Sequence, residues 1–435
     1  MSLGRDEEQV DIAIIGAGAA GLFATIWAGK NLESYPIRIA VFDGAKKLGA
    51  KILVAGGGRC NVTHRRVTEH DFAGSSPAAI RKVLRRFTVA QTIQFFSSAG
   101  VELKEEETGK LFPVTDSART ILHALIEQAK KVHASLAHPA RVTEIEQLAA
   151  DEIAKGVKQG PWFRVVSTCG VVVAQHVIVC TGGKSLPKSG SDGGSYKLVE
   201  RLGHTITKPL VPALVPLILE DSHWIRQLSG VTVPTTVTLS TASGKRIFSC
   251  SGSTLCTHLG LSGPAILDIS RHWLIERNAD SDVQLSINWL PGLDAETVDK
   301  LLQSQRTGAL GVLRQRLPDR LARRICLESQ APFVGDLTRP VRKKLVQSIV
   351  ATPLPVTGDR GFSIAEATAG GVPLAEVNLE TMESRTCPGL YLAGEVLDVD
   401  GRIGGFNFQW AWSSAYVAGS AVAKSVIERN PCEST

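Results

Sequence analysis

The stretch Val10-Asp11-Ile12-Ala13-Ile14-Ile15-Gly16-Ala17-Gly18-Ala19-Ala20-Gly21-Leu22 decides the fold of this chain. Its apolar, β-branched part, residues 12–15, predicts a buried strand. The alanine-rich run that follows, residues 19–30, predicts a helix. The sequence therefore begins with a strand, a glycine-rich turn and a helix.

Three glycines at G-x-G-x-x-G spacing form that turn, and each has its own expected role. Gly16 permits the tight turn, Gly18 lets backbone approach a pyrophosphate, and Gly21 lets helix and strand pack closely. The helix start, with Ala19 and Ala20, offers free N–H groups and a partial positive charge to phosphate. The motif is weak alone, but here it stands between a predicted strand and a predicted helix.

A carboxylate stands where a dinucleotide site needs one. The next predicted strand, residues 37–42, ends at Asp43. Asp43 follows the last glycine by about 20 residues, the distance at which an acidic residue binds the ribose of a dinucleotide. An ordinary strand–turn–helix unit with a surface aspartate is the alternative, and the context favours the dinucleotide site.

Composition describes a soluble globular protein of several domains. The 435 residues are enough for two or three domains, and 43% of them are hydrophobic and 21% charged. The net charge of +6 is modest for this length. The basic clusters at 81–86 and 342–344 have helix-like surroundings, so we interpret them as solvated helix faces and do not expect nucleic acid as a partner.

Cysteine usage and hydropathy favour a cytoplasmic location. The eight cysteines include no C-x-x-C pair, so we expect neither a metal site nor a disulfide framework. The polar, acidic start at 1–8 argues against a secretory signal. No apolar run approaches the ~18 residues that a membrane span needs, so no membrane association is expected.

A second glycine-rich stretch follows Asp43. Gly56, Gly57 and Gly58 suit backbone that lies against a ligand, although a flexible hinge would also use them. Arg59 beside them could neutralise phosphate charge, and Asn61 could donate a hydrogen bond to a ring carbonyl.

Two later strands also end in glycines. A strand over 170–174 and an apolar strand over 177–180 lead into Thr181, Gly182 and Gly183, and another strand ends at Gly394 and Glu395. Gly404, Gly405, Phe406 and Asn407 then precede an alanine- and serine-rich helix. The carboxyl edge of an open parallel sheet is where such proteins bind ligands, so these glycines are expected to meet there.

The remaining pattern suggests an inserted domain. Residues 78–99 and 117–133 predict amphipathic helices. After about residue 205, short strands with frequent prolines predict a β-barrel or sandwich. We therefore expect a first part of a dinucleotide domain at 1–204, a β-barrel substrate domain at 205–293 and 351–364, a helical insert at 294–350, and the second part of the dinucleotide domain at 365–435.

An N-terminal glycine loop with a C-terminal strand and helix that close the same domain is typical of FAD enzymes of the glutathione-reductase type. The sequence resembles the family of bacterial flavoproteins that includes the aminoacetone-oxidase-like and bile-acid-reductase (BaiN/YhiN-type) proteins. The stretches that carry the resemblance cover nearly the whole chain: GAGAAG, AKILVAGGGRCNVTH, GKLFPVTDSA, VIVCTGGKSLPKSGSDG, CTHLGLSGPAIL, ATAGGVPLAEV and GLYLAGEVLDVDGRIGGFNFQWAWSSAYVAG.

The resemblance implies an α/β fold in which a glutathione-reductase-type FAD-binding Rossmann domain is interrupted by a β-barrel with a small helical insert. It places Gly16, Gly18 and Asp43 at the ADP half of FAD and Val142 near the adenine. Arg59, Cys60 and Asn61 would follow the pyrophosphate and flavin. The ribityl chain and isoalloxazine would face Glu395, Gly405 and Asn407. Asp43 departs from the pattern, since glutamate is commoner there.

Two side chains raise the question of catalysis. Cys60 lies near the region where flavin disulfide reductases carry a cysteine pair, but the next cysteine is Cys169, so a packed or flavin-contacting thiol is favoured. His258 is the candidate proton donor, although a lone histidine is more often a satisfied polar residue.

These features predict an FAD-dependent oxidoreductase that acts on a small or medium organic substrate. Oxidation of an amine or amino-ketone by oxygen and reduction of a C=C bond driven by NAD(P)H both fit. Because no second G-x-G-x-x-G appears, any NAD(P)H would visit only transiently. An RNA-modifying flavoprotein and a non-enzymatic flavin-dependent redox sensor are the alternatives.

Overall fold

The computed structural model describes residues 8–149, 162–303 and 308–429, and these fall into two compact units. The first unit comprises Met1–Leu210 and Glu366–Thr435, and the second comprises Val211–Ala365. The strands β11 (Val211–Ala213) and β19 (Ala367–Ala369) lie beside these boundaries in sequence. The polar start of the chain, on which the expectation about a secretory signal depends, lies outside the described residues.

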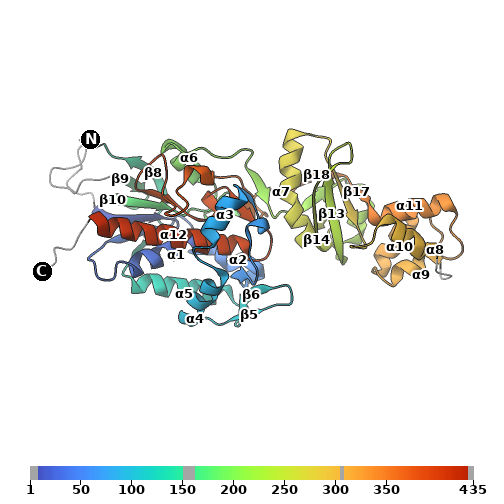
Figure 1. Cartoon of the computed structure of the whole chain (residues 1–435), viewed down its shortest axis with the longest axis horizontal. Coiled ribbons are helices and arrows are strands. Elements are labelled where there is room, and N and C mark those ends of the chain that lie inside the picture. The colour runs from blue at the N-terminus through green and yellow to red at the C-terminus, as the bar shows by residue number, and fades with distance from the viewer. Residues whose placement is uncertain (1–7, 150–161, 304–307, 430–435) are drawn as a thin grey trace. The chain divides into compact units, whose positions relative to one another are not determined.

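A seven-stranded sheet forms the centre of the first unit, and five of its strands are parallel. Figure 1 labels β8 (Val142–Gln147), β9 (Phe163–Ser167) and β10 (Gly170–Val179) of this sheet. The order of the parallel part is β7-β2-β1-β10-β20, and its other strands are β7 (Ser135–Ala137), β2 (Ile39–Phe42), β1 (Glu8–Ile15) and β20 (Leu390–Leu392). Ile15 is paired with both Phe42 and Val179, and Val179 is paired with Leu392. Because these strands are parallel and in this register, their carboxyl ends share one edge of the sheet.

β10 is one long strand, whereas the sequence predicts two strands separated by Gln175 and His176. Both polar side chains are buried inside the sheet, so they do not interrupt the strand. The first half of β10 pairs antiparallel with β9, which pairs with β8. The second half joins the parallel sheet.

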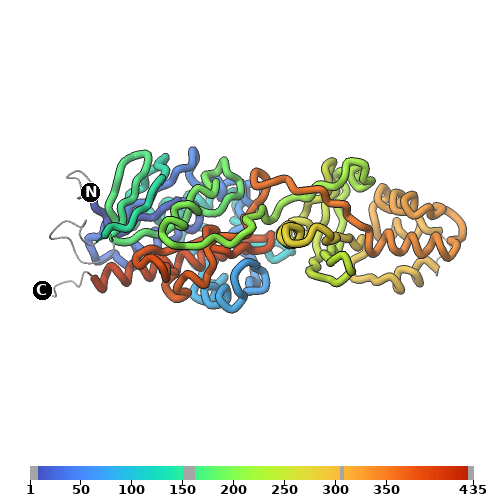
Figure 2. Tube along the Cα trace, turned by 90° about the horizontal axis from the view of Figure 1, so that it is seen from above, coloured from blue at the N-terminus to red at the C-terminus, as the bar shows by residue number. Residues whose placement is uncertain are grey.

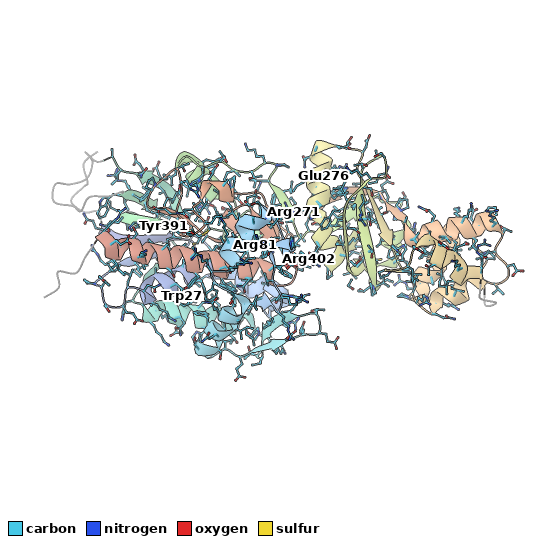
Figure 3. The ribbon with its side chains drawn as sticks, viewed as in Figure 1. Trp27, Arg81, Arg271, Glu276, Tyr391 and Arg402 are labelled. Carbon is cyan, nitrogen blue, oxygen red and sulfur yellow. The ribbon has the colours of Figure 1, made fainter. Side chains whose placement is uncertain are left out.

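Helices cover this sheet and pack closely on one another. Gly419 of the C-terminal helix permits this approach, since a Cβ there would lie 2.5 Å from the carbonyl oxygen of Ala24. Figure 3 shows Trp27, which belongs to an aromatic cluster under the same helix, and Tyr391 on β20. The helices are α1 (Ala19–Lys30), α2 (Ala50–Gly58), α3 (Pro77–Leu84), α4 (Val89–Ser98), α5 (Ala118–Lys131), α6 (Gly194–Arg201) and α12 (Phe406–Arg429).

The single helix expected over 78–99 is wrong, because two helices, α3 and α4, occupy this segment. The first ends at Leu84, and Thr88 caps the start of the second: its side chain accepts a hydrogen bond from the backbone of Gln91, and the Gln91 side chain accepts one from the N–H of Thr88. This capping box starts a new helix within what looks like a continuous apolar pattern. Short strands complete the unit: β3 (Thr63–His64), β4 (Phe72–Gly74), β5 (Leu103–Glu105), β6 (Lys110–Pro113) and β21 (Val399–Gly401).

The second unit is built on an antiparallel sheet of order β17-β16-β13-β14-β15-β12-β18. Only Pro355 separates β17 from β18, so one extended segment pairs with β16 at one end and with β12 at the other and closes the sheet into a barrel. Helix α7 (Pro264–Ala279) packs against β13 and β14. The strands are β12 (Leu217–Leu219), β13 (Thr232–Ser240), β14 (Arg246–Cys256), β15 (Gly260–Ser262), β16 (Gln284–Asn288), β17 (Thr352–Leu354) and β18 (Val356–Asp359).

A group of four helices interrupts this barrel between β16 and β17 (Figure 2). They are α8 (Ala295–Gln303), α9 (Gly308–Arg314), α10 (Asp319–Ser329) and α11 (Arg339–Val350). Val298, Leu313, Leu321, Ile325 and Leu345 are buried and form their common core.

None of the helices in 8–149, 162–303 and 308–429 is long and apolar enough to cross a membrane. Within the same ranges, no group of three or more His, Cys, Asp or Glu side chains could hold a metal ion.

Candidate functional site

The glycine turn after β1 lies at the carboxyl edge of the parallel sheet. Gly16 has a φ of +96°, and a Cβ there would lie 2.6 Å from the carbonyl oxygen of Cys180. A Cβ on Gly21 would lie 1.7 Å from the carbonyl oxygen of Gly16. Both glycines are therefore required by the protein's own backbone.

Gly18 differs from its two neighbours in the motif. Its φ of −79° and ψ of −160° suit any residue, and apart from its two neighbours in the chain no described residue has an atom within 4 Å of the position a Cβ would take. Gly18 precedes α1, whose first N–H groups, those of Ala19 and Ala20 included, cannot be satisfied inside the helix. The open space in front of free N–H groups fits a phosphate group.

The buried side chain of Asp43 holds this glycine turn by hydrogen bonds to backbone N–H groups. Its Oδ2 accepts a hydrogen bond from the N–H of Ala17 at 2.7 Å, and its Oδ1 accepts one from Ala45 at 2.8 Å. Its backbone oxygen accepts from the N–H of Ala140 at 2.6 Å, which brings the start of β8 at Val142 to the same edge. The predicted ribose and adenine residues thus belong to one corner of the sheet.

The triple glycine lies where α2 loses its helical geometry. Ala55 leaves the helix with a ψ of 143°, and Gly56 and Gly57 are left-handed, with φ of +57° and +68°. Gly58 follows with a φ of +87°. Cys60 is also left-handed, with a φ of +61°, and is fully buried. The segment is a tight backbone turn, as its glycine content predicts.

Asn61 presents a buried polar atom without a partner. Its Oδ1 makes no hydrogen bond to any described residue. A Cβ on Gly405 would lie 2.8 Å from this atom, so the triple-glycine turn and the 404–407 segment meet here. Orphaned buried amide atoms are rare, and a bound heterocycle with polar edges would satisfy this one.

Arg59 lies among carboxylates of its own chain. Its guanidinium is 2.6 Å from Glu106 and 3.7 Å from Asp116, and it stacks over the ring of Phe112 at 4.1 Å. These contacts fasten the glycine turn to the β5–β6 hairpin. A phosphate contact by Arg59 stays a prediction, since it would compete with this cluster.

Cys60 sits in an environment that disfavours thiolate chemistry. Burial raises the pKa of its thiol well above the ordinary range, so the thiol stays protonated. All described cysteines are free, including Cys60 and the buried Cys180.

The second glycine edge, after β10, meets the C-terminal return. Thr181 donates its hydroxyl hydrogen to Ser195 at 2.6 Å, and Gly182 has a φ of +74°. A Cβ on Gly183 would lie 2.5 Å from Thr368 Oγ1 and 2.8 Å from Glu395 Oε1. Gly183 is therefore needed for the approach of Glu395.

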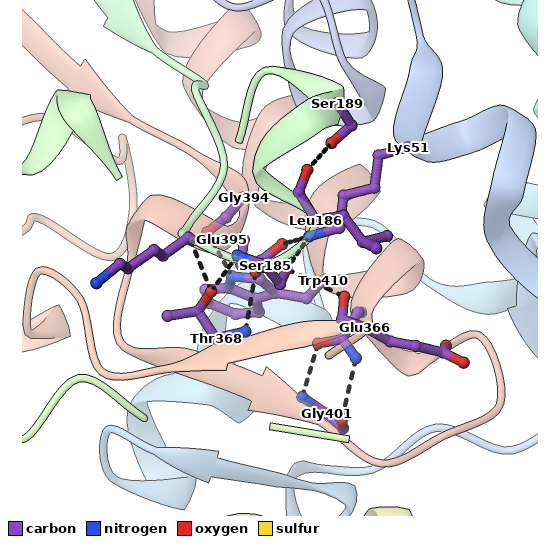
Figure 4. Close-up of polar contacts among 12 residues, drawn as sticks. Lys51, Ser185, Leu186, Ser189, Glu366, Thr368, Gly394, Glu395, Gly401 and Trp410 are labelled. Atoms are coloured by element: carbon purple, nitrogen blue, oxygen red, sulfur yellow. Dashed lines mark hydrogen bonds and ion pairs between the residues drawn. The ribbon is translucent and has the colours of Figure 1, made fainter. Parts of the chain in front are cut away.

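Glu395 is the centre of a polar network (Figure 4). The ammonium group of Lys51 contacts Glu395 Oε2 and Ser185 Oγ, each at 2.5 Å. Ser185 donates to Glu395 Oε1 at 3.0 Å, and the N–H of Thr368 donates to the same oxygen at 2.9 Å. The network ties α2, the segment after β10 and the C-terminal return together. Neither Lys51 nor Ser185 is among the site residues predicted from the sequence, although each adjoins a glycine motif.

The start of α12 is shaped by its own side chains. Gly404 and Gly405 have φ of +131° and +94°. Asn407 accepts a hydrogen bond from the N–H of Gly401 at 2.8 Å and donates to its carbonyl at 3.0 Å, and Phe406 stacks on His64 at 4.9 Å. Asn407 thus holds the turn, and a flavin contact by its side chain stays a prediction. Gly394 has a φ of +78°, and its carbonyl accepts from Trp410 at 3.1 Å.

His258 belongs to the second unit, at the tip of the hairpin between β14 and β15. The turn is closed by mutual hydrogen bonds between Thr257 and Gly260, and His258 is exposed. Arg226 donates to the backbone oxygen of His258 at 2.9 Å. Its role as proton donor remains a prediction.

Open space at a helix start, a buried carboxylate beside it and an orphaned amide beside a second glycine turn all fit FAD. The fold and these edges define a Rossmann-type FAD flavoprotein. The family model "HI0933-like protein Rossmann domain" matches residues 10–421, and the chain belongs to this family.

Relatives and a solved structure agree with that family. The chain is 34% identical over 418 residues to a ribosomal RNA dihydrouridine synthase of Escherichia coli K12, which covers 94% of this chain and 97% of that one. It is 30% identical over 423 residues to the 3-dehydro-bile acid delta(4,6)-reductase of Clostridium scindens, with 95% and 99% covered. The 3-ketosteroid delta1-dehydrogenase of Sterolibacterium denitrificans shares the fold, with a TM-score of 0.53, 10% identity and 96% and 100% covered. The protein is thus an FAD-dependent oxidoreductase.

Proposed function

We propose that the protein is an FAD-dependent reductase that saturates a C=C bond conjugated with a carbonyl group, and that its substrate is a uracil base in RNA. The observation that carries the proposal is the chemistry common to two unlike relatives that match nearly the whole chain. A dihydrouridine synthase saturates the uracil C5–C6 bond, which is conjugated with the C4 carbonyl. A delta(4,6)-reductase of a 3-keto bile acid saturates bonds conjugated with the C3 ketone.

This shared chemistry favours reduction over the oxidation of amines or amino-ketones. In both substrates a hydride adds to an electrophilic carbon conjugated with the carbonyl, the β carbon in uracil and the β or δ carbon in a 4,6-dien-3-one, and a proton adds to the adjacent carbon nearer the carbonyl. The flavin supplies the hydride when bound. RNA is favoured over a steroid-like enone because the RNA-modifying relative is the more similar of the two.

The residues of the chain would divide the work of binding. The α1 start behind Gly18 would hold the pyrophosphate, and Asp43 would bind the ribose of the adenosine half. The amide of Asn61 would bind a polar edge of the isoalloxazine. The Lys51–Glu395 pair would fix the backbone around the ribityl chain, because it joins α2 to the C-terminal return.

Proton donation to the substrate and reduction of the flavin need groups beyond the carboxyl edge of the parallel sheet. We propose His258 as the donor of the proton to the α carbon, since it is exposed and free to approach a substrate. NADH or NADPH would reduce the flavin in a transient encounter.

The test is reduction of RNA by the purified FAD-loaded protein under anaerobic conditions. NADH or NADPH should bleach the flavin, and unmodified bacterial ribosomal RNA should reoxidise it with formation of dihydrouridine, detected by mass spectrometry of nucleosides. A steroid dienone and aminoacetone serve as competing substrates. If the dienone reoxidises the flavin and RNA does not, the substrate is a steroid-like enone and not RNA. Bleaching by aminoacetone, but not by NAD(P)H, would overturn the reductase proposal.

A further inference from the structure

The positive charge of this protein is concentrated in one short part of the second unit. The chain has 48 basic and 42 acidic residues. Residues 308–350 contain nine of the basic residues and three of the acidic ones. The rest of the chain therefore carries 39 of each sign and is neutral. The whole net charge of +6 comes from helices α9, α10 and α11 and their connections.

Several of these cations are neutralised by carboxylates of the same unit. Arg314 and Arg323 pair with Asp319, and Arg324 pairs with Glu328 at 2.7 Å. Arg320 is used differently, since its guanidinium donates to the carbonyl oxygens of Gln227 and Ser229. The surface of α10 is thus largely compensated.

Helix α11 is not compensated in this way. It carries Arg339, Arg342, Lys343 and Lys344 and no acidic residue. Arg342 pairs with Asp299 at 2.7 Å. Arg339, Lys343 and Lys344 are exposed and have no ion pair with any carboxylate of the described residues. These three exposed cations lie within six residues of one another, and we call them the α11 basic face.

The chemistry of this face distinguishes among polyanions. An amphipathic helix that enters a membrane surface needs exposed apolar residues beside its cations. The apolar residues of α11, including Leu345, Val346 and Ile349, are instead buried in the core of the insert. Exposed lysines on a helix that carries no acidic residue of its own suit sequence-independent contacts to phosphates of a nucleic acid.

We infer that the α11 basic face is a docking surface for the phosphate backbone of RNA. The inference rests on the proposed function, because it assigns the part of the chain that holds the polymer while a base is reduced. The proposal differs from the expectation that the 342–344 cluster is an ordinary solvated helix face. Residues of α11, which lie far in sequence from the glycine motifs, would then contribute to the affinity for RNA without contacting the uracil that is reduced.

The experiment measures binding and does not depend on turnover. Full-length FAD-loaded protein is titrated with protein-free bacterial ribosomal RNA in a filter-binding assay over a series of salt concentrations. The test variant is Lys343→Gln/Lys344→Gln. The control is Lys82→Gln/Arg85→Gln, which removes two exposed charges near Arg81 on and after α3 (Figure 3) and gives the same net charge.

The expected effect follows from counterion release. Each lost phosphate contact should lower the steepness of log K against log salt by about 0.7, so two contacts weaken binding about tenfold at physiological salt. Lys343→Arg/Lys344→Arg should restore affinity, and FAD content should match wild type in every variant. The control should bind as wild type does.

Three results would overturn the inference: equal losses in the test and control variants, no loss in either, or tighter binding of wild type to polyglutamate or to phosphatidylglycerol vesicles than to RNA. Failure of the proposed function has a different signature. In that case RNA binds through the α11 basic face, but no dihydrouridine forms. If the wild type forms dihydrouridine and the test variant binds RNA as tightly as the wild type, the docking surface is refuted and the proposed function stands.

Discussion

Gly18→Val should separate cofactor binding from folding. The backbone of Gly18 is extended and, apart from its two neighbours in the chain, no described residue has an atom within 4 Å of its Cβ position, so valine meets no steric obstacle in the folded chain. Valine is a poorer helix N-cap than glycine, which costs up to about 1 kcal/mol. It also restricts the unfolded chain, which returns about 0.4–1 kcal/mol. The free energy of unfolding of the cofactor-free protein should therefore change by no more than about 1 kcal/mol.

FAD binding should respond very differently. The valine side chain would fill the space in front of the α1 start, where the phosphates approach the backbone. Loss of two charge-assisted N–H to phosphate hydrogen bonds, at about 1.5–3 kcal/mol each, corresponds to about 3–6 kcal/mol. The dissociation constant for FAD should then rise by about 10²- to 10⁴-fold.

The assay is titration of cofactor-free protein with FAD, followed by quenching of flavin fluorescence, alongside urea unfolding of the same sample. Gly21→Ala is the matched control, because its Cβ would lie 1.7 Å from the carbonyl oxygen of Gly16 and should disrupt the fold itself. Wild-type affinity for FAD in a folded Gly18→Val protein would refute the placement of the pyrophosphate. Unfolding of Gly18→Val as severe as that of Gly21→Ala would refute the claim that this glycine serves the ligand alone.

Three further predictions concern single side chains. Burial and the nearby charge of Arg429 lower the pKa of His176 from 6.5 to about 3, so its stabilising effect is complete above pH 6.5 and is lost as the pH falls towards 3. Lowering the pH from 7 to 5 should cost about 2 kcal/mol in urea unfolding through this group, and His176→Leu should remove that part of the pH dependence. Cys60→Ser should keep most of the rate of flavin reduction, since the buried thiol is protonated; a loss of about a thousandfold with FAD retained would reveal a redox role. His258→Ala should slow substrate reduction by about a hundredfold with FAD bound, and an unchanged rate would leave this histidine without a catalytic role.

Local sequence patterns predict much of the first unit, because its signals are local. Residues 12–15 and 19–30 become a buried strand and a helix around the glycine turn, at nearly the expected bounds. The patterns fail where tertiary context decides. Gln175 and His176 look like a strand break, yet the sheet buries both within β10. The capping box at Thr88 divides a periodic apolar pattern into two helices.

The candidate site shows a deeper reason for incomplete prediction. Motif spacing identifies Arg59 and Asn407 as polar residues beside glycines, but it cannot tell whether they face a ligand or the chain. In the fold, Arg59 binds carboxylates and Asn407 binds the backbone of Gly401. Lys51 becomes visible only through Glu395, a residue 344 positions away. Such partners are set by the meeting of distant strand ends.

The three glycines of the first turn make this distinction sharpest. In sequence they form one motif, and any of them could serve the cofactor. In the fold, a side chain at Gly16 or Gly21 collides with backbone, whereas a side chain at Gly18 enters empty space. Because the protein's own packing does not require Gly18, we attribute its place in the motif to a ligand that approaches its backbone. Open space in front of the free N–H groups of α1 suits a pyrophosphate, because those groups can donate hydrogen bonds to its oxygens.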